Sequence, residues 1–211
     1  MKYIVSCVLI LIFAQVGQSQ MSTRKNAMTY KFVLIDYNTL DPTYRTANPK
    51  RIFHPSDVNY AFELGYFRYI NNSFNIAAPL RIGSIDAHHN LVAVDDSTCA
   101  PCQRRFYPKE FFVGLDAMGI YKFNNGYILK EDFWIAPYIT LGIGAKYMAK
   151  RKGHFDFQIP IGLGVNIKLT EGFYIQAQLE YRKSVVINKD NLGISAGLLW
   201  VIGKKEATLD N

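Results

Sequence analysis

The feature that most constrains the fold of this chain is a two-residue alternation of apolar and polar side chains, which recurs between residues 28 and 202. Within residues 155–167, every odd-numbered side chain is apolar, whereas the even-numbered positions carry mostly polar side chains or glycine. Residues 173–182 repeat the pattern. Two residues is the repeat of a β-strand, because successive side chains of a strand point to opposite faces. The alternation therefore predicts an all-β chain whose strands each have one apolar and one polar face.

Turn-forming residues divide this region into eight segments, each about as long as a tilted transmembrane strand of ~9–11 residues. The predicted strands are residues 28–38, 59–70, 74–85, 111–123, 134–147, 154–168, 173–185 and 192–202. After the N-terminal segment, no apolar run approaches the ~18 residues that a membrane-spanning helix needs. With 211 residues, the chain has the length of one domain.

Two features favour a membrane barrel over a soluble β-sandwich or a lipocalin-like barrel, which alternate in the same way. The polar face is rich in glycine, at Gly142, Gly144, Gly162 and Gly164 among others, and small residues suit a narrow lumen. Aromatic residues gather at the predicted strand ends, where the girdles of membrane barrels form. The sequence therefore predicts an all-β fold, an eight-stranded antiparallel up-and-down transmembrane β-barrel.

The first residues have the pattern of a secretory signal peptide. Lys2 precedes an apolar segment at 3–14, and small residues at Gly17 and Ser19 predict cleavage after Ser19. The predicted organisation is a signal peptide at 1–19, a barrel at 20–203 and a short periplasmic tail at 204–211. Short and long connections alternate along the barrel, and outer-membrane barrels place their short turns in the periplasm. Both termini are therefore expected on the periplasmic side.

Four segments carry a resemblance to a known family. They are FNIAAPLRIG at 74–83, WIAPYITLGIGAKY at 134–147, FDFQIPIGLGVNIKLTEGFYIQAQLEYR at 155–182 and NLGISAGLLWVIG at 191–203. The chain resembles the N-terminal eight-stranded barrel of OmpA-type outer-membrane proteins of Gram-negative bacteria. The resemblance implies an integral outer-membrane protein that lies in outer-membrane lipid. Residues 195–202 also resemble the insertion signal that the barrel-assembly machinery reads, although Ile202 stands where an aromatic residue is usual.

Charged residues at inward-facing positions form the first candidate site. By alternation, five charged side chains point into the lumen: Glu63, Arg81, Asp116, Glu180 and Arg182. The interior of an eight-stranded barrel is just wide enough for side chains to fill it, and buried charges must pair. We therefore expect a salt-bridged plug. A turn centred near Asn72 places Glu63 opposite Arg81, Phe62 opposite Ile82 and Leu64 opposite Leu80.

Cys99 and Cys102 form a CxxC motif in a predicted long loop. A redox dithiol needs the first cysteine at a helix N-terminus, and a zinc site would have to recruit His88 and His89 at an unusual spacing. In an exported chain, a disulfide between the two cysteines is the favoured interpretation. No catalytic triad motif is recognised, and the sequence predicts no metal, no cofactor and no enzymatic activity.

The formal net charge of +7 suits anionic partners. No nucleic-acid-binding motif accompanies it, so nucleic acid is not an expected partner. The basic residues of the predicted outer loops are expected to form a rim that meets lipopolysaccharide phosphates, unless they are simply solvated. The predicted basic rim comprises Arg45, Lys50, Arg51, Arg104, Arg105, Lys150, Arg151 and Lys152.

The sequence thus predicts a protein with a structural, envelope-integrity or surface-interaction role. A narrow porin-like channel for small solutes is the first alternative, and single-channel conductance distinguishes it. A soluble ligand-binding β-barrel is the second, and detergent-dependent solubility with heat-modifiable migration on gels distinguishes that one.

Overall fold

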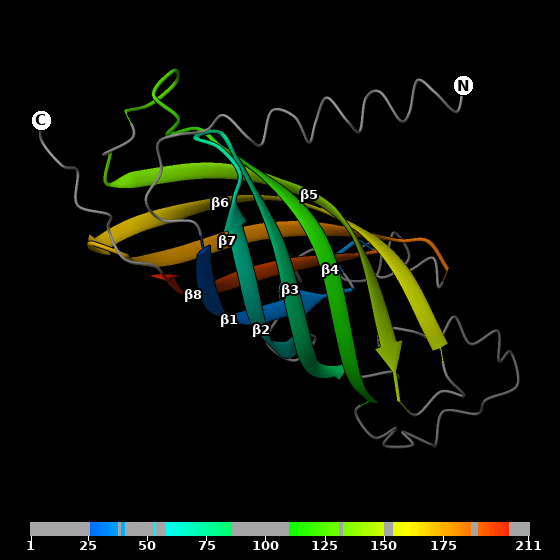
Figure 1. The fold of residues 1–211 in the computed structure, drawn as a ribbon. Coiled ribbons are helices and arrows are strands. Elements are labelled where there is room, and N and C mark those ends of the chain that lie inside the picture. Colours follow the sequence, from blue (N-terminus) through cyan, green and yellow to red (C-terminus); the bar gives the residue numbers. More distant parts are fainter. Residues whose placement is uncertain are drawn as a thin grey trace, which may run out of the picture.

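The computed structural model describes residues 26–37, 39–40, 53, 58–85, 110–130, 133–149, 154–186 and 190–202. These residues form a closed barrel in which each strand pairs antiparallel with its neighbours in the chain and β1 pairs with β8 (Figure 1). The strands are β1 (Asn26–Asp36), β2 (Asn59–Tyr69), β3 (Phe74–Ile85), β4 (Glu110–Lys122), β5 (Ile135–Met148), β6 (His154–Thr170), β7 (Phe173–Ser184) and β8 (Asn191–Ile202). The predicted eight-stranded fold is confirmed, with strand ends that differ from the prediction by no more than about two residues, as strand assignments commonly do.

The two ends of the barrel differ in their connections. Asn26 pairs with Ile202, and the same rim carries the connections 70–73, 123–134 and 171–172. We call this the short-turn rim and the opposite end the long-connection rim. The 70–73 turn is held by Asn71, whose Oδ1 accepts hydrogen bonds from the backbone N–H of Ser73 at 2.9 Å and of Phe74 at 2.7 Å. Gly172 adopts a φ of 89°, a conformation that favours glycine.

The register across the 70–73 turn is the one that the sequence predicts. Phe62 pairs with Ile82, Glu63 with Arg81, and Leu64 with Leu80. Because side chains alternate, this register places the two charged residues inside the barrel and the apolar residues outside.

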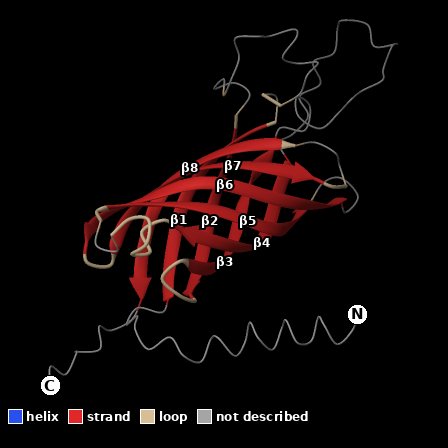
Figure 2. Cartoon of the chain, turned by 90° about the horizontal axis from the view of Figure 1, so that it is seen from above, coloured by secondary structure: helices blue, strands red, loops and turns tan. Residues whose placement is uncertain are grey.

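The outer surface of the barrel is apolar. At mid-height, Phe62 is 71% exposed, Ile143 70% and Leu163 62%. A soluble monomer rarely exposes such a continuous apolar surface, whereas the lipid-facing band of a membrane barrel consists of it. Figure 2, with strands in red, shows no helix in the described part of the chain. None of the described residues forms a helix long and apolar enough to cross a membrane. The apolar outer surface and the closed hydrogen bonding identify a transmembrane barrel.

Aromatic pairs mark the two borders of this apolar band. Towards the short-turn rim, Phe173 stacks on Trp200 with ring centroids 5.9 Å apart, and the rings of Phe74 and Tyr121 lie 5.0 Å apart. Towards the long-connection rim, the ring centroids of Tyr147 and Phe155 lie 5.3 Å apart. Aromatic side chains at both borders are the girdles that membrane barrels place at the two lipid–water interfaces.

Glycines inside the barrel make room for larger inward side chains on neighbouring strands. Tyr138 on β5 pairs with Gly164 on β6, and a Cβ at position 164 would overlap the tyrosine ring. Asp116 on β4 pairs with Gly144 on β5, where a Cβ would overlap the carboxylate. Both glycines therefore serve close packing in the lumen, as the glycine-rich inner face predicts.

The inward face is less uniformly polar than the alternation predicts. Two buried apolar clusters occupy opposite ends of the lumen. The short-turn apolar layer comprises Ala27, Phe67, Ala77, Met118, Ile120, Tyr138 and Leu199. The long-connection apolar layer comprises Val33, Ile35, Tyr37, Ala61, Ile85, Phe112 and Met148. Along β1, the inward order is Ala27, Thr29, Lys31, Val33 and Ile35, so the charged position lies between the two layers.

The charge network in the lumen

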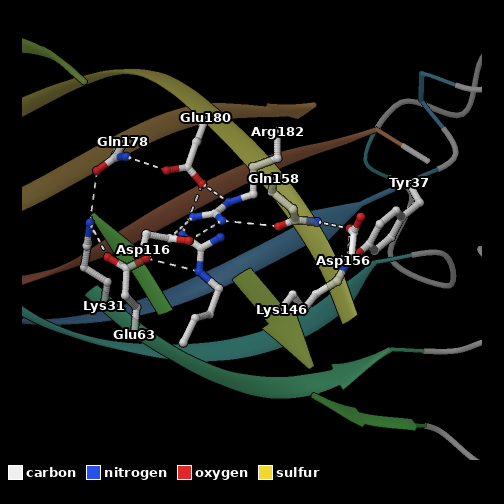
Figure 3. Close-up of polar contacts among 11 residues, drawn as sticks. Lys31, Tyr37, Glu63, Asp116, Lys146, Asp156, Gln158, Gln178, Glu180 and Arg182 are labelled. Atoms are coloured by element: carbon white, nitrogen blue, oxygen red, sulfur yellow. Dashed lines mark hydrogen bonds and ion pairs between the residues drawn. The ribbon is translucent and has the colours of Figure 1, made fainter. Parts of the chain in front are cut away.

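The candidate site is a connected group of buried polar side chains in the middle of the lumen. Figure 3 shows Lys31 and Gln178 at one end of the group and Tyr37 at the other. We call the group the lumen charge network. Its ionised members are Lys31, Glu63, Arg81, Asp116, Lys146, Asp156, Glu180 and Arg182. They come from β1 to β7, because each strand places an inward position at this height.

Arg81 joins two carboxylates of different strands. Its Nη2 lies 2.5 Å from Glu63 Oε2 on β2 and 3.1 Å from Glu180 Oε1 on β7. Glu63 also forms an ion pair with Lys31, whose Nζ lies 2.6 Å from Glu63 Oε1. Glu63 is therefore neutralised by one base from each neighbouring strand, and both bases are buried with it.

Arg182 holds a carboxylate on the opposite wall. Its Nη2 and Nη1 donate to the two oxygens of Asp116 at 2.5 and 3.1 Å, which is a two-pronged pair. Its Nε lies 2.5 Å from Glu180 Oε1, so Glu180 accepts from both arginines. The Arg182–Asp116 pair joins β7 to β4 across the lumen.

The network continues towards the long-connection rim through neutral and charged groups. Gln158 accepts from Arg182 Nη1 at 3.3 Å and donates to Asp156 Oδ2 at 2.8 Å. Asp156 pairs with Lys146, whose Nζ lies 3.5 Å away and donates to the Tyr37 hydroxyl at 3.1 Å. Hydrogen bonds and ion pairs thus form a continuous path through much of the lumen.

The network is balanced in charge and contains little free space. Its four bases face four carboxylates, so its formal charge is zero. A cavity of about 10 Å³ lies beside Arg81, Lys146 and Arg182, which is about the space that one water molecule needs. Pairing offsets the cost of removing these charges from water, which is several kcal/mol for each ion by general estimates.

A separate polar clasp lies at the long-connection rim. The Asp190 carboxylate accepts from the Tyr181 hydroxyl at 2.6 Å, from Lys183 Nζ at 3.0 Å and from the Ser184 backbone N–H at 3.0 Å. Partial burial opposes the ionisation of Asp190, but these hydrogen bonds outweigh it and hold its pKa below the ordinary value. The clasp ties the end of β7 to the start of β8.

The five charged residues that the sequence places in the lumen all lie there, within one network. Sequence reasoning missed three further members, Lys31, Lys146 and Asp156, although the same alternation points them inward. The predicted disulfide of Cys99 and Cys102 lies outside the described residues. So does the whole predicted basic rim: Arg45, Lys50, Arg51, Arg104, Arg105, Lys150, Arg151 and Lys152.

The described part of the chain contains no group of three or more His, Cys, Asp or Glu side chains arranged to hold a metal ion. What the network does offer chemically is fixed charge pairs, with each carboxylate occupied by a base.

No protein-family model matches this chain, and no curated protein matches it in sequence. Among solved structures, the chain is similar to Neisserial surface protein A, with a TM-score of 0.50 and 12% identity over 86% of this chain and 98% of that one. Outer membrane protein OprG of Pseudomonas aeruginosa gives a TM-score of 0.49 with 8% identity over 86% and 97% of the two chains. The N-terminal β-barrel domain of Pseudomonas aeruginosa OprF gives 0.48 with 14% identity over 85% and 100%. At 12% identity the likeness to Neisserial surface protein A concerns the fold alone, and at that level it agrees with the predicted resemblance to eight-stranded outer-membrane barrels.

Proposed function

We propose that this protein is a non-conducting outer-membrane barrel that supports envelope integrity or surface contacts, with a lumen plugged by its charge network. The observation that carries the proposal is the continuous path of buried ion pairs and hydrogen bonds from Lys31 to Lys146, which lies beyond the short-turn apolar layer. A hydrated ion that crossed the lumen would have to separate these pairs and pass the short-turn apolar layer. Each carboxylate or base that lost its partner in this interior would carry a large free-energy penalty.

The proposal includes an orientation and a set of partners. The short-turn rim faces the periplasm, as in barrels that keep their long loops outside. The chain reaches the membrane through a signal peptide cleaved after Ser19 and is inserted by the barrel-assembly machinery. The predicted basic rim contacts lipopolysaccharide phosphates, for which arginine and lysine are suited. A non-catalytic role agrees with a lumen in which every network carboxylate is paired with a base.

Cells that lack this protein test the role. We expect them to become more sensitive to large hydrophobic antibiotics, because the outer leaflet loses a protein that binds its phosphates. Uptake of small hydrophilic solutes should not change. Slower uptake of such solutes in the deletion strain would favour the porin-like channel and contradict the proposal.

Complementation tests the predicted rim. The wild-type gene should restore resistance, whereas a variant with Lys150, Arg151 and Lys152 all changed to alanine should restore little of it. The matched control changes Lys130 and Lys168, near the opposite rim, to alanine. If the triple variant restores resistance fully at normal surface levels, the lipopolysaccharide contact is wrong.

A further inference from the structure

The lumen opens at the short-turn rim into a pocket of about 220 Å³. We call it the short-turn cup. Its lining residues are Asn26, Ala27, Phe67, Tyr69, Asn75, Lys122, Asn124, Ala136, Asn166, Tyr174, Leu199 and Val201. All eight strands contribute to this wall. The cup is therefore held by the rigid frame of the barrel.

The cup ends at an apolar floor. Ala27, Phe67 and Leu199 belong both to the cup and to the short-turn apolar layer, against which Tyr174 and Val201 also pack. The lumen charge network lies beyond this layer, at Lys31 on β1 and Glu63 on β2. A cup with a closed apolar floor suits the retention of a ligand better than its passage.

The polar part of the lining is made mainly of neutral amides. Four asparagines are among the lining residues, with Lys122 as the basic residue and no carboxylate among them. Of the four, Asn26 directs its amide oxygen to the exposed Tyr66 hydroxyl outside the lumen. An amide both donates and accepts hydrogen bonds, as a hydroxyl does. This composition disfavours metal cations, which need oxygen ligands with negative charge, and a single lysine is a weak basis for binding a polyanion.

Three of these amides have unmet hydrogen-bonding capacity. The side-chain oxygens of Asn75, Asn124 and Asn166 are buried and have no hydrogen-bond partner within the described part of the chain. A buried polar atom without a partner costs about 1–3 kcal/mol. Donors supplied by a ligand or by ordered water would remove this cost, and the three residues come from different parts of the wall.

Aromatic side chains complete the cup. Tyr69, Phe67 and Tyr174 are part of its lining, and the Lys122 ammonium lies 4.6 Å from the centroid of the Tyr69 ring. Amides that match hydroxyl groups, together with aromatic surfaces, suit a ring that carries hydroxyls at its edge and C–H groups on its faces. The volume is below the ~300–1,000 Å³ of drug-sized pockets, so one ring fits.

We propose that the short-turn cup binds a single sugar ring, neutral and polyhydroxylated. The sugar is either free in solution or the terminal unit of a glycan chain. This binding activity does not depend on whether the lumen conducts, and it can fail or succeed independently of the proposed plug.

Nuclear magnetic resonance of the folded protein in a phosphocholine detergent tests the proposal, because sugar-headed detergents would compete for the cup. The probes are glucose, N-acetylglucosamine and a peptidoglycan-derived disaccharide, with glycerol as a polyol that lacks a ring. We expect saturable shifts of the backbone amide signals of Ala27, Asn75 and Ala136 with at least one sugar. If the disaccharide binds at least tenfold more tightly than either monosaccharide, the ligand is the end of a glycan chain. If the affinities are equal, the ligand is a free sugar.

Two variants test the cup in different ways. Asn166→Leu removes an unpartnered amide, and Ala136→Leu, on the neighbouring strand, fills the cup without replacing an asparagine. Each should weaken binding at least tenfold, whereas Asn59→Ala, at the long-connection end of β2, should leave it unchanged. Heat-modifiable migration on gels verifies that each variant is folded. The proposal is overturned if no sugar gives saturable shifts, if glycerol gives the same shifts, or if both folded cup variants bind as tightly as the wild type.

Discussion

At the scale of single residues, the number of basic partners distinguishes the carboxylates of the network. Glu63 contacts Lys31 and Arg81, and Glu180 contacts Arg81 and Arg182. Asp116 has only Arg182 as a basic partner within the described part of the chain. Removing one of the two arginines therefore has unequal consequences, because Asp116 would lose its ion pair, whereas Glu63 and Glu180 would each keep one.

The first prediction compares the two arginines. Arg81→Ala leaves Glu63 with Lys31 and Glu180 with Arg182, so we expect a loss of about 3 kcal/mol in the free energy of unfolding, the lower end for a broken buried pair. Arg182→Ala leaves Asp116 unpaired, and its loss should be nearer to about 5 kcal/mol. Urea unfolding in lipid vesicles measures both values.

A double variant and a surface control sharpen this comparison. Arg182→Met combined with Asp116→Asn removes both charges and should recover most of the stability that Arg182→Ala loses. Lys168→Ala, at an exposed position near the end of β6, should change the free energy of unfolding by less than about 0.5 kcal/mol. Equal losses for Arg81→Ala and Arg182→Ala would contradict the assigned pairing.

At the same scale, alternation predicts which charged residues point inward but not which of them meet. Glu63 and Arg81 lie on neighbouring strands, so a turn centred near Asn72 suffices to pair them. Arg182 and Asp116 lie on β7 and β4, and their contact depends on the diameter and stagger of the closed barrel. No local pattern in the sequence contains that information.

At the scale of strands, the seam between β1 and β8 closes the barrel and depends on a glycine. Gly197 pairs with Lys31, and a Cβ at position 197 would overlap the backbone carbonyl of Tyr30 and lie 2.6 Å from the Cα of Lys31. Four residues earlier on β8, a Cβ at Gly193 would have its nearest neighbour, the Glu180 carbonyl oxygen, at 3.8 Å. Alanine at position 197 would therefore require the β1 backbone to move, whereas alanine at position 193 would fit without any movement.

The second prediction uses this matched pair. Gly197→Ala should lower the free energy of unfolding by about 1–3 kcal/mol, because the backbone of β1 must move to admit the methyl group. Gly193→Ala should be neutral or stabilise the fold by up to about 1 kcal/mol, because it restricts the unfolded chain. Unfolding midpoints in the same vesicles decide the matter, and a Gly193→Ala variant as unstable as Gly197→Ala would refute the packing of this seam.

The third prediction concerns depth in the bilayer along β6. Leu163 lies near the middle of the strand and Leu169 near its end at the short-turn rim, and both are exposed on the outer face. Leu163→Arg should lower the free energy of unfolding by about 2–4 kcal/mol, and Leu169→Arg by about 0–1 kcal/mol. The cost of an arginine on the lipid face falls towards the interface. Similar costs at the two positions would show that β6 does not cross a bilayer in this register.

Strand positions and outward faces are predictable because turn-forming residues separate the strands and a repeat of two assigns their faces. The apolar layers inside the lumen are not, since residues 32–35 of β1 are all apolar and alternation cannot assign them a face. The short-turn cup is also hidden from the sequence. Its asparagines are far apart in the chain, and they come together only when the barrel closes.

At the scale of the whole molecule, the proposed plug has three levels: the short-turn apolar layer, the charge network, and the long-connection apolar layer, whose members come from β1 to β5 and Tyr37 but not from β6 to β8. β2 shows the order, with Phe67 in the short-turn layer, Glu63 in the network and Ala61 in the long-connection layer. The ion pairs are buried, and a buried pair is harder to separate than one in water. The proposed lack of conductance therefore depends on all three levels together.

Single-channel recording in planar lipid bilayers tests this central proposal most directly. The wild-type protein, inserted and verified as folded by heat-modifiable migration, should show no conductance steps above the noise of a protein-free bilayer. Arg81→Ala, which removes the side chain that links Glu63 to Glu180, should show brief openings if it folds. Stable, regular conductance steps from the wild-type protein would contradict the plugged lumen and identify the barrel as a channel.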